Sequence, residues 1–348
     1  MATEPYAHPR IPHPCRAWDA STLWARPGWR MRLPGEVVDE GLASLAQQPP
    51  GDMDLEEFGF DAEANPALAG FGRELHERLF QMEGVCWIRG LADWGLSAEE
   101  QRFLYLAIGL AMGNALTPYG RLYAVEDRGG DYTTMAVPVS ATASETGFHT
   151  DSSSVDTLPD IVGLLCEQPG TLGGESLITN ALRAHRDLCL RAPEVIATLE
   201  QDYIRDVVTP GRERTEANLL RNRFPIFSGH GRSRIFRYMR YWIEQGQQDA
   251  GLPLSSEQIA ALDALDSVLS EPEHVVQFRL ERGDMLFLDN RIVAHNRLAY
   301  RDAPGTRRRM QRMWIEASPL SSSSLHSASS QPSLPDLAVS ARHSRTDH

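Results

Sequence analysis

FHTD at residues 148–151 and GDMLFLDNRIVAH at residues 283–295 are the two stretches that decide the expected fold and chemistry of this chain. In the first, His149 and Asp151 are separated by two positions, so on an extended strand their side chains project to the same side. In the second, a turn leads into an apolar strand and then to His295. Two histidines and one carboxylate are typical of a facial triad, which leaves one face of an octahedral iron open for other ligands.

A run of arginines, RRRMQR at residues 307–312, follows the second stretch. Arg308 and Arg312 are four positions apart, so on a strand they face the same side. One guanidinium is suited to hold the distal carboxylate of a dicarboxylic ligand, and the other an anionic group of a substrate. Strand alternation favours Arg308 over Arg309 for the inward position, but a bulge of one residue would reverse that order.

The composition excludes several classes of protein. All 34 basic residues among the 348 are Arg. Without a Lys, the chain cannot build a P-loop, a pyridoxal Schiff base or a Ser-x-x-Lys hydrolase. The formal net charge of −13 disfavours a general nucleic-acid binder, whose affinity comes largely from cations on phosphates. We therefore expect a small-molecule substrate and no nucleic acid partner.

Nothing in the sequence indicates a membrane or a secretory route. The four Cys residues are widely spaced and form no C-x-x-C pair, so neither a zinc ribbon nor a disulfide scaffold is indicated. The first 18 residues lack the basic and apolar segments of a signal peptide. The longest apolar stretch, 104–112, is far shorter than the roughly 20 residues that span a bilayer. These observations favour a soluble, cytoplasmic protein.

The domain organisation follows from a change of composition near residue 318. In 318–348, eleven of 31 residues are Ser and none is aromatic, and such a segment cannot offset its ordering entropy by burial. We expect a flexible Ser-rich tail at 318–348, a short N-terminal arm at 1–17 and one domain over 18–317. The Arg-rich segment 209–223 lies between expected strands and is a candidate lid.

Helical signals gather early in the chain and strand signals follow. Ser97 and Glu100 form a capping-box pattern ahead of apolar residues at helical spacing, and 65–84 has the pattern of an amphipathic helix. Further helices are expected over 181–190 and 256–269. Short β-type runs bounded by turn residues are expected at 85–88, 121–125, 161–166, 204–208, 235–238, 275–280, 285–288 and 310–315. This pattern predicts a mostly β fold with flanking helices rather than regular βαβ alternation.

Four motifs in this order resemble the taurine dioxygenase and clavaminate synthase-like (TauD/TfdA) family of Fe(II)/2-oxoglutarate-dependent oxygenases. His149-Thr150-Asp151 matches the family's H-[TS]-[DE] motif, and GGES at 173–176 matches its Gly-Gly-x-[ST] segment. Asp289-Asn290 with His295 matches the late D-N-x-x-x-x-H motif, and Arg308 lies 13 residues beyond His295. The four motifs are in register over about residues 84–316.

The resemblance implies a double-stranded β-helix, a cupin-like jelly roll, with iron held by His149, Asp151 and His295 at one mouth. The cosubstrate 2-oxoglutarate would chelate the metal through its 1-carboxylate and 2-keto oxygen, while its distal carboxylate pairs with Arg308 and the Ser176 hydroxyl. O2 completes the coordination. The family couples release of succinate and CO2 to oxidation of a substrate C–H bond, normally hydroxylation.

The substrate side of the site gives weaker signals. Glu145 lies four residues before His149, in a stretch that lines the substrate pocket in relatives, so it is a candidate to hold a substrate amine, with Arg312 holding an acid group. This favours a small polar substrate, amino-acid-like or a natural-product intermediate of secondary metabolism. Desaturation, epoxidation or cyclisation would use the same oxidant. Two other classes stay open: a zinc hydrolase with the same three ligands, and a non-catalytic jelly-roll binding protein.

Overall fold

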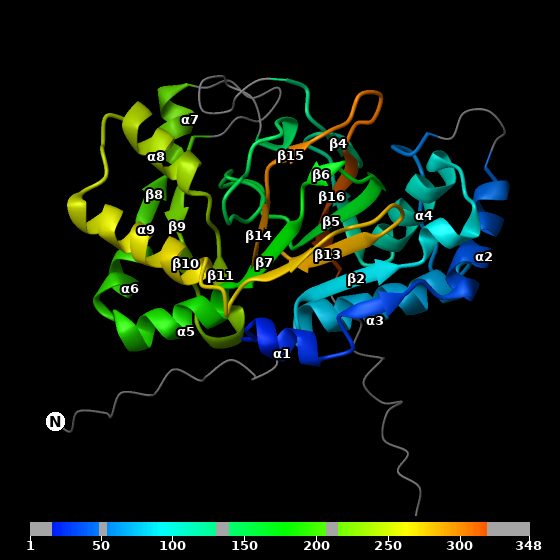
Figure 1. Cartoon of the computed structure of the whole chain (residues 1–348), viewed down its shortest axis with the longest axis horizontal. Helices are drawn as coiled ribbons and strands as arrows, with labels where there is room; N and C mark the ends of the chain where they lie inside the picture. The colour runs from blue at the N-terminus through cyan, green and yellow to red at the C-terminus, as the bar shows by residue number, and fades with distance from the viewer. Residues whose placement is uncertain (1–15, 49–53, 130–138, 207–214, 319–348) are drawn as a thin grey trace, which may run out of the picture. The chain divides into compact units, whose positions relative to one another are not determined.

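A seven-stranded mixed sheet forms the larger layer of the fold (Figure 1). The computed structural model describes residues 16–48, 54–129, 139–206 and 215–318. Strand β1 pairs with β2 in parallel, and the other pairings in this sheet are antiparallel. The strand order is β1 (Arg30–Arg32), β2 (Val85–Arg89), β13 (Met285–Asp289), β5 (Ile161–Gln168), β16 (Arg309–Ala317) and β3 (Gly113–Leu116), with β4 (Tyr123–Val125) also on β16.

A smaller antiparallel sheet faces the larger one. Its order is β12 (Val276–Phe278), β7 (Ser176–Asn180) and β14 (Val293–Arg297). Apolar side chains of both sheets pack into one buried cluster between them, including Ile178 and Val293 from the small sheet and Leu286, Leu288 and Met310 from the large one. Two facing sheets around one core make a jelly roll, as the sequence predicted. Three two-stranded ladders complete the β structure: β15 (Tyr300–Arg301) with β6 (Leu172–Gly173), β10 (Phe227–Ser228) with β11 (Ile235–Phe236), and β8 (Asp202–Ile204) with β9 (Arg223–Pro225).

Helices cover the outer face of the large sheet. The helices α2 (Gly35–Ala46), α3 (Pro66–Gln81) and α4 (Ala98–Leu110) pack against it through a second buried cluster. The capping box predicted from Ser97 and Glu100 is present at the start of α4. A third cluster joins helices to the short ladders. The remaining helices are α1 (Ala20–Ala25), α5 (Ala181–Arg191), α6 (Glu194–Leu199), α7 (Glu216–Arg221), α8 (Arg240–Asp249) and α9 (Ser256–Leu269), with short 3-10 turns at Leu91–Trp94, Val139–Ala141 and Gly231–Ser233.

The ends of the chain and the candidate lid lie partly outside the described residues. The chain divides into a compact unit, Met1–Ser318, and a second unit, Pro319–His348, and the predicted tail falls outside the description except for Ser318. Of the predicted N-terminal arm, the described Arg16 already pairs with Asp289 of β13 at 2.7 Å. In the candidate lid, 215–223 contains α7 and the start of β9, and 209–214 is not described.

The described part of the chain contains no helix that is both long and apolar enough to cross a membrane.

Candidate active site

The two predicted histidines meet where the segment after Gly147 joins β14. His149 and His295 form an isolated antiparallel β-bridge, in which each backbone N–H donates to the other residue's carbonyl oxygen at 2.9 Å. Directly opposed residues carry their side chains on the same face of a sheet, and the two ring centroids lie 4.3 Å apart. Backbone pairing therefore brings together imidazoles from distant parts of the sequence.

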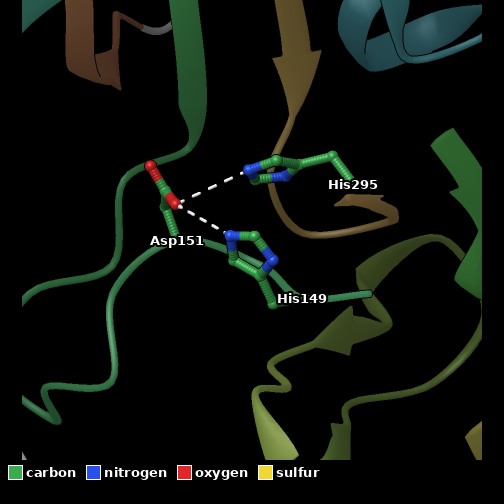
Figure 2. Close-up of side chains that lie close together, drawn as sticks. All are labelled: His149, Asp151 and His295. Atoms are coloured by element: carbon green, nitrogen blue, oxygen red, sulfur yellow. Dashed lines mark ion pairs between the residues drawn. The ribbon is translucent and has the colours of Figure 1, made fainter. Parts of the chain in front are cut away.

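Asp151 completes a cluster of three side chains that could hold a metal ion (Figure 2). Its Oδ1 lies 3.7 Å from His149 Nε2 and 3.6 Å from His295 Nε2. One ligand atom from each residue lies within 4.8 Å of the others. The structure thus brings together the three residues that the sequence singled out, and two imidazole nitrogens with one carboxylate oxygen suit a divalent transition metal.

Asn290, the second residue of the D-N motif, fixes the backbone of Asp151. Its side-chain Oδ1 accepts from the Asp151 N–H at 2.8 Å, and its Nδ2 donates to the Asp151 and Pro159 carbonyls at 3.1 and 3.0 Å. Ser152, which follows Asp151 in the sequence, has φ of 70°, a left-handed conformation that is uncommon for a non-glycine residue. The chain therefore turns sharply directly after Asp151.

Two donors from β16 hold the other oxygen of the Asp151 carboxylate. The Trp314 indole N–H donates to Oδ2 at 2.6 Å, and Arg312 Nη1 lies 3.2 Å from the same atom. Burial alone would raise the pKa of Asp151, but the Arg312 cation, the two histidines and the Trp314 bond lower it to about 2. The carboxylate is therefore ionised at neutral pH, with Oδ1 left facing the imidazoles.

Both imidazoles are neutral at the same pH. Burial lowers the pKa of His149, and burial together with the neighbouring His149 lowers the pKa of His295 to about 3. Metal binding requires neutral imidazole nitrogens and an ionised carboxylate. All three side chains are thus in the protonation state of a ligand.

The triad lies in a cavity of about 160 Å³ between the two sheets. Four alternate residues of one stretch, Arg308, Met310, Arg312 and Trp314, line it. This is the inward face that strand alternation predicted. Other lining residues include Tyr119, Ser152, Ser153, Ser154, Thr157, Ser176, Asp206, Met239, Trp242, Asn296 and Arg297.

The choice between Arg308 and Arg309 depends on a bulge, and the bulge is in the neighbouring strand. Arg309 pairs with Gln168 and Met310 with Cys166, so the additional residue is Glu167 of β5 and the alternation along β16 is unbroken. Arg308 is buried and lines the cavity. Arg309 instead pairs with Glu167 at 3.0 Å and is absent from the cavity lining.

Ser176 and the glycines of the GGES motif adjoin Arg308. Ser176 is buried and lines the same cavity. Gly173 and Gly174 have φ of 76° and 77°, which favours glycine. A Cβ on Gly174 would lie only 3.3 Å from Arg308 Nε. The motif therefore gives Arg308 room beside the backbone.

The two candidate substrate residues lie in different surroundings. Arg312 lines the cavity, pairs with Asp151 and lies over the rings of Tyr123 and Trp314, at 5.1 and 4.8 Å from their centroids. Glu145 is exposed, and its carboxylate accepts a 2.8 Å bond from Asn296 Nδ2. Asn296 lines the cavity and Glu145 does not, so the direct contact of Glu145 with a substrate stays a prediction.

Several cavity residues were not predicted. Arg297 on β14 and Trp314 on β16 follow His295 in the sequence, and Asp206 lies three residues before the candidate lid at 209–223. On a strand, Arg297 shares a face with His295 two positions earlier, and Trp314 shares a face with Arg312. Both could therefore have been predicted to face inward. No local sequence signal marks Asp206, whose backbone N–H donates to the Trp242 carbonyl of α8 at 2.9 Å.

A second group with metal-ligand residue types lies away from this cavity. Glu271, Glu273 and His274 lie close together, but His274 is buried and its Nε2 lies 3.0 Å from Asp187. Its Nδ1 bonds the Val268 carbonyl. His274 is therefore held in a polar network just after α9, whereas Glu273 is exposed.

Known proteins with similar sequences and structures support this arrangement. The family model described as "Taurine catabolism dioxygenase TauD, TfdA family" matches residues 46–314. FR-33289 synthase of Streptomyces rubellomurinus (strain ATCC 31215) is 28% identical over 298 residues, which cover 80% of this chain and 84% of the relative. An asparagine oxygenase, solved with Fe(II), 2S,3S-3-hydroxyasparagine and succinate, has a TM-score of 0.60 at 22% identity, covering 82% of this chain and 93% of that one.

A second solved structure has the same fold. The non-heme iron oxygenase OrfP, solved with Fe, succinate and (3S)-hydroxy-L-Arg, has a TM-score of 0.58 at 17% identity and covers 83% of this chain and 94% of its own. At these identities the solved structures support the jelly-roll fold, whereas the family model covers most of the sequence. The chain therefore belongs to the TauD/TfdA family of Fe(II)/2-oxoglutarate-dependent oxygenases.

Proposed function

We propose that His149, Asp151 and His295 hold Fe(II) and that this chain is a 2-oxoglutarate-dependent dioxygenase acting on a small polar molecule. The observation that carries the proposal is the triad in one cavity with a buried arginine. The donor set fits iron, because two neutral imidazoles and one ionised carboxylate oxygen lie within 4.8 Å of one another. The Asp151 Oδ2 is engaged by Trp314 and Arg312, which leaves Oδ1 for the metal.

We further propose that Arg308 and Ser176 hold the distal carboxylate of 2-oxoglutarate. Arg308 Nε and Nη1 are buried with no hydrogen-bond partner among the described residues. A buried cation without a partner is costly, and a carboxylate can accept two parallel bonds from one guanidinium. Ser176 adds a hydroxyl donor on the same cavity wall. These features support an anion site at that end of the cavity.

When bound, the iron and the keto acid supply an oxidant that O2 forms with release of succinate and CO2. The chain itself supplies position and exclusion of water. Leu164, Leu286 and Met310 form an apolar part of the cavity wall on the side of the large sheet. The bonds to Asp151 and the His149–His295 bridge fix the ligand atoms relative to a substrate carbon. Such geometric control is the protein's main contribution to this chemistry.

For the substrate, we propose a molecule with an acid group and an amine, such as an amino acid or a natural-product intermediate. A guanidinium has five N–H donors, so Arg312 keeps donors for an acid group while it pairs with Asp151. Glu145 is the proposed partner of the amine, directly or through Asn296. The solved relatives bound to hydroxyasparagine and hydroxyarginine are consistent with such a substrate, and hydroxylation is the proposed outcome.

We also propose that the protein works in a reducing cytoplasm, without a nucleic acid or membrane partner. Cys86, Cys166 and Cys189 are free thiols. Burial raises the pKa of Cys86 and of Cys166, so these two are inert core thiols.

The test is anaerobic absorption of the protein on addition of Fe(II) and then 2-oxoglutarate. We expect the visible charge-transfer band of a keto-acid chelate, and its loss in His149→Ala and in Asp151→Ala. Succinate formation under O2 with a panel of amino acids then identifies the substrate class. Product mass separates hydroxylation, a gain of one oxygen, from desaturation, a loss of two hydrogens. If no band forms and the protein instead holds zinc tightly, the oxygenase proposal is wrong.

A further inference from the structure

A second buried arginine lies in the cavity beside the proposed cosubstrate anchor. Arg297 ends β14, lines the cavity and is 8% exposed. Its Nε has no hydrogen-bond partner among the described residues. Its Nη2 donates to the Ser144 carbonyl, which fixes the side chain without neutralising it. The function proposed above assigns no role to the Arg297 guanidinium.

The register of the small sheet places Arg297 at the far end of the site from the metal. Arg297 is directly opposite Ser176, and His295 is directly opposite Ile178. Opposed residues share a face, so Arg297 and Ser176 point the same way, as does His295 two positions earlier. Two residues of strand rise roughly 7 Å. A five-carbon diacid chelated at the triad can span such a distance with its distal carboxylate.

Arg297 and Arg308 both contact the ring of Tyr300. Their guanidinium groups lie 4.9 and 5.1 Å from the centroid of the same Tyr300 ring. In the described residues, no carboxylate lies within ion-pair distance of either group. Two buried like charges are unfavourable unless an anion joins them.

We infer that Arg297 and Arg308 together clamp the distal carboxylate of 2-oxoglutarate, with Ser176 as the third donor. This inference rests on the proposed function. A carboxylate has two oxygens with about four acceptor positions, so it can take bonds from both guanidinium groups and the hydroxyl. Arg297 is then a determinant of cosubstrate specificity. It selects a diacid over a keto acid with an apolar end.

The experiment compares two keto acids that share one chelating head. 2-Oxoglutarate ends in a carboxylate, and 2-oxopentanoate has the same chain length and ends in a methyl group. Each is titrated anaerobically into the Fe(II)-loaded protein, and the dissociation constant is read from the chelate band. The variants are Arg297→Gln, Arg297→Lys and, as a matched control, Arg309→Gln, which removes an arginine from the outer face near the same anchor.

We expect Arg297→Gln to weaken 2-oxoglutarate roughly 10- to 100-fold and to leave 2-oxopentanoate unchanged. Arg297→Lys should recover part of the loss, and Arg309→Gln should behave as wild type. Equal weakening of both keto acids by Arg297→Gln would indicate a structural effect through Ser144 and overturn the inference. No change with either ligand would overturn it as well, with the proposed function intact. Absence of any band in the wild type would overturn both.

Discussion

The hydrogen bond from Trp314 to Asp151 allows a sharp test of how the chain prepares its metal site. The indole N–H donates to Oδ2 at 2.6 Å, and Arg312 lies 3.2 Å from the same oxygen. Oδ1 remains 3.7 and 3.6 Å from the two imidazole nitrogens. Trp314→Phe keeps an aromatic ring in the wall but removes the N–H, so one of the two restraints on the carboxylate is lost.

The magnitude follows from the kind of bond and from what remains. A hydrogen bond to a charged group contributes about 1.5–3 kcal/mol. Because Arg312 still holds Oδ2 in the variant, we expect the lower part of that range, about 1.5–2 kcal/mol. This corresponds to metal binding weaker by roughly 10- to 30-fold at 25 °C. In other metalloproteins, residues that hydrogen-bond to a metal ligand typically contribute 10- to 100-fold to metal affinity.

The assay is an anaerobic titration with Co(II), whose visible absorption reports occupancy without turnover. The matched control is Trp242→Phe, the same change at another tryptophan of the cavity, for which no bond to Asp151 exists in the described contacts. Both variants lose packing and should melt somewhat lower without metal. Only Trp314→Phe should bind Co(II) more weakly. Equal Co(II) affinity of the two variants would refute the restraint on Oδ2.

Three further predictions concern other parts of the site and the fold. Arg308→Gln should raise the dissociation constant for 2-oxoglutarate at least roughly tenfold, whereas Arg309→Gln, on the opposite face of β16, should not, as measured by the anaerobic chelate band. Asn290→Ala should lower the free energy of unfolding by about 2–4 kcal/mol in urea denaturation, because Asn290 is fully buried with three bonds to the backbone; an unchanged midpoint would contradict this. Asp19→Asn should be destabilising at pH 7, and the difference from wild type should vanish as the pH falls from about 4. Burial opposes ionisation of Asp19, but the hydrogen bonds it accepts at the start of α1 hold its pKa well below the ordinary value. Its stabilisation is therefore complete above the unfolded pKa and is lost as the pH falls toward the folded pKa. A difference independent of pH would show that only packing is lost.

The parts of the site that the sequence predicted are those set by alternation along one strand. His149 and Asp151 at i and i+2, and Arg308 and Arg312 at i and i+4, depend only on local extended geometry. Helices α3, α4, α5 and α9 were also predicted from the sequence, because apolar spacing and capping residues are local signals. The metal-ligand residues could be grouped because the resemblance supplied the long-range pairing that local spacing does not.

Helix α8 shows why other elements were missed. Its sequence begins Arg-Tyr-Trp-Ile and belongs to an aromatic and Arg-rich run at 236–242, where the sequence predicted only a strand at 235–238. In the structure the run divides: Phe236 and Tyr238 are buried in the core, while Met239 and Trp242 line the cavity. The helix also depends on Gly246, since a Cβ there would lie 2.5 Å from the Asp206 backbone nitrogen. Such close tertiary packing overrides local propensity.

Strand β16 explains why one irregularity in the sheet does not disturb the site. Arg308, Met310, Arg312 and Trp314 face the cavity in succession, so one stretch supplies the proposed anion anchor, an apolar wall and both donors to Asp151. A shift of one residue along this strand would turn all four outward, because side chains alternate with a period of two. The extra residue in the ladder is Glu167 on β5. Since the bulge lies on the neighbouring strand, the alternation that points Arg308 and Arg312 toward the proposed metal ligands is retained.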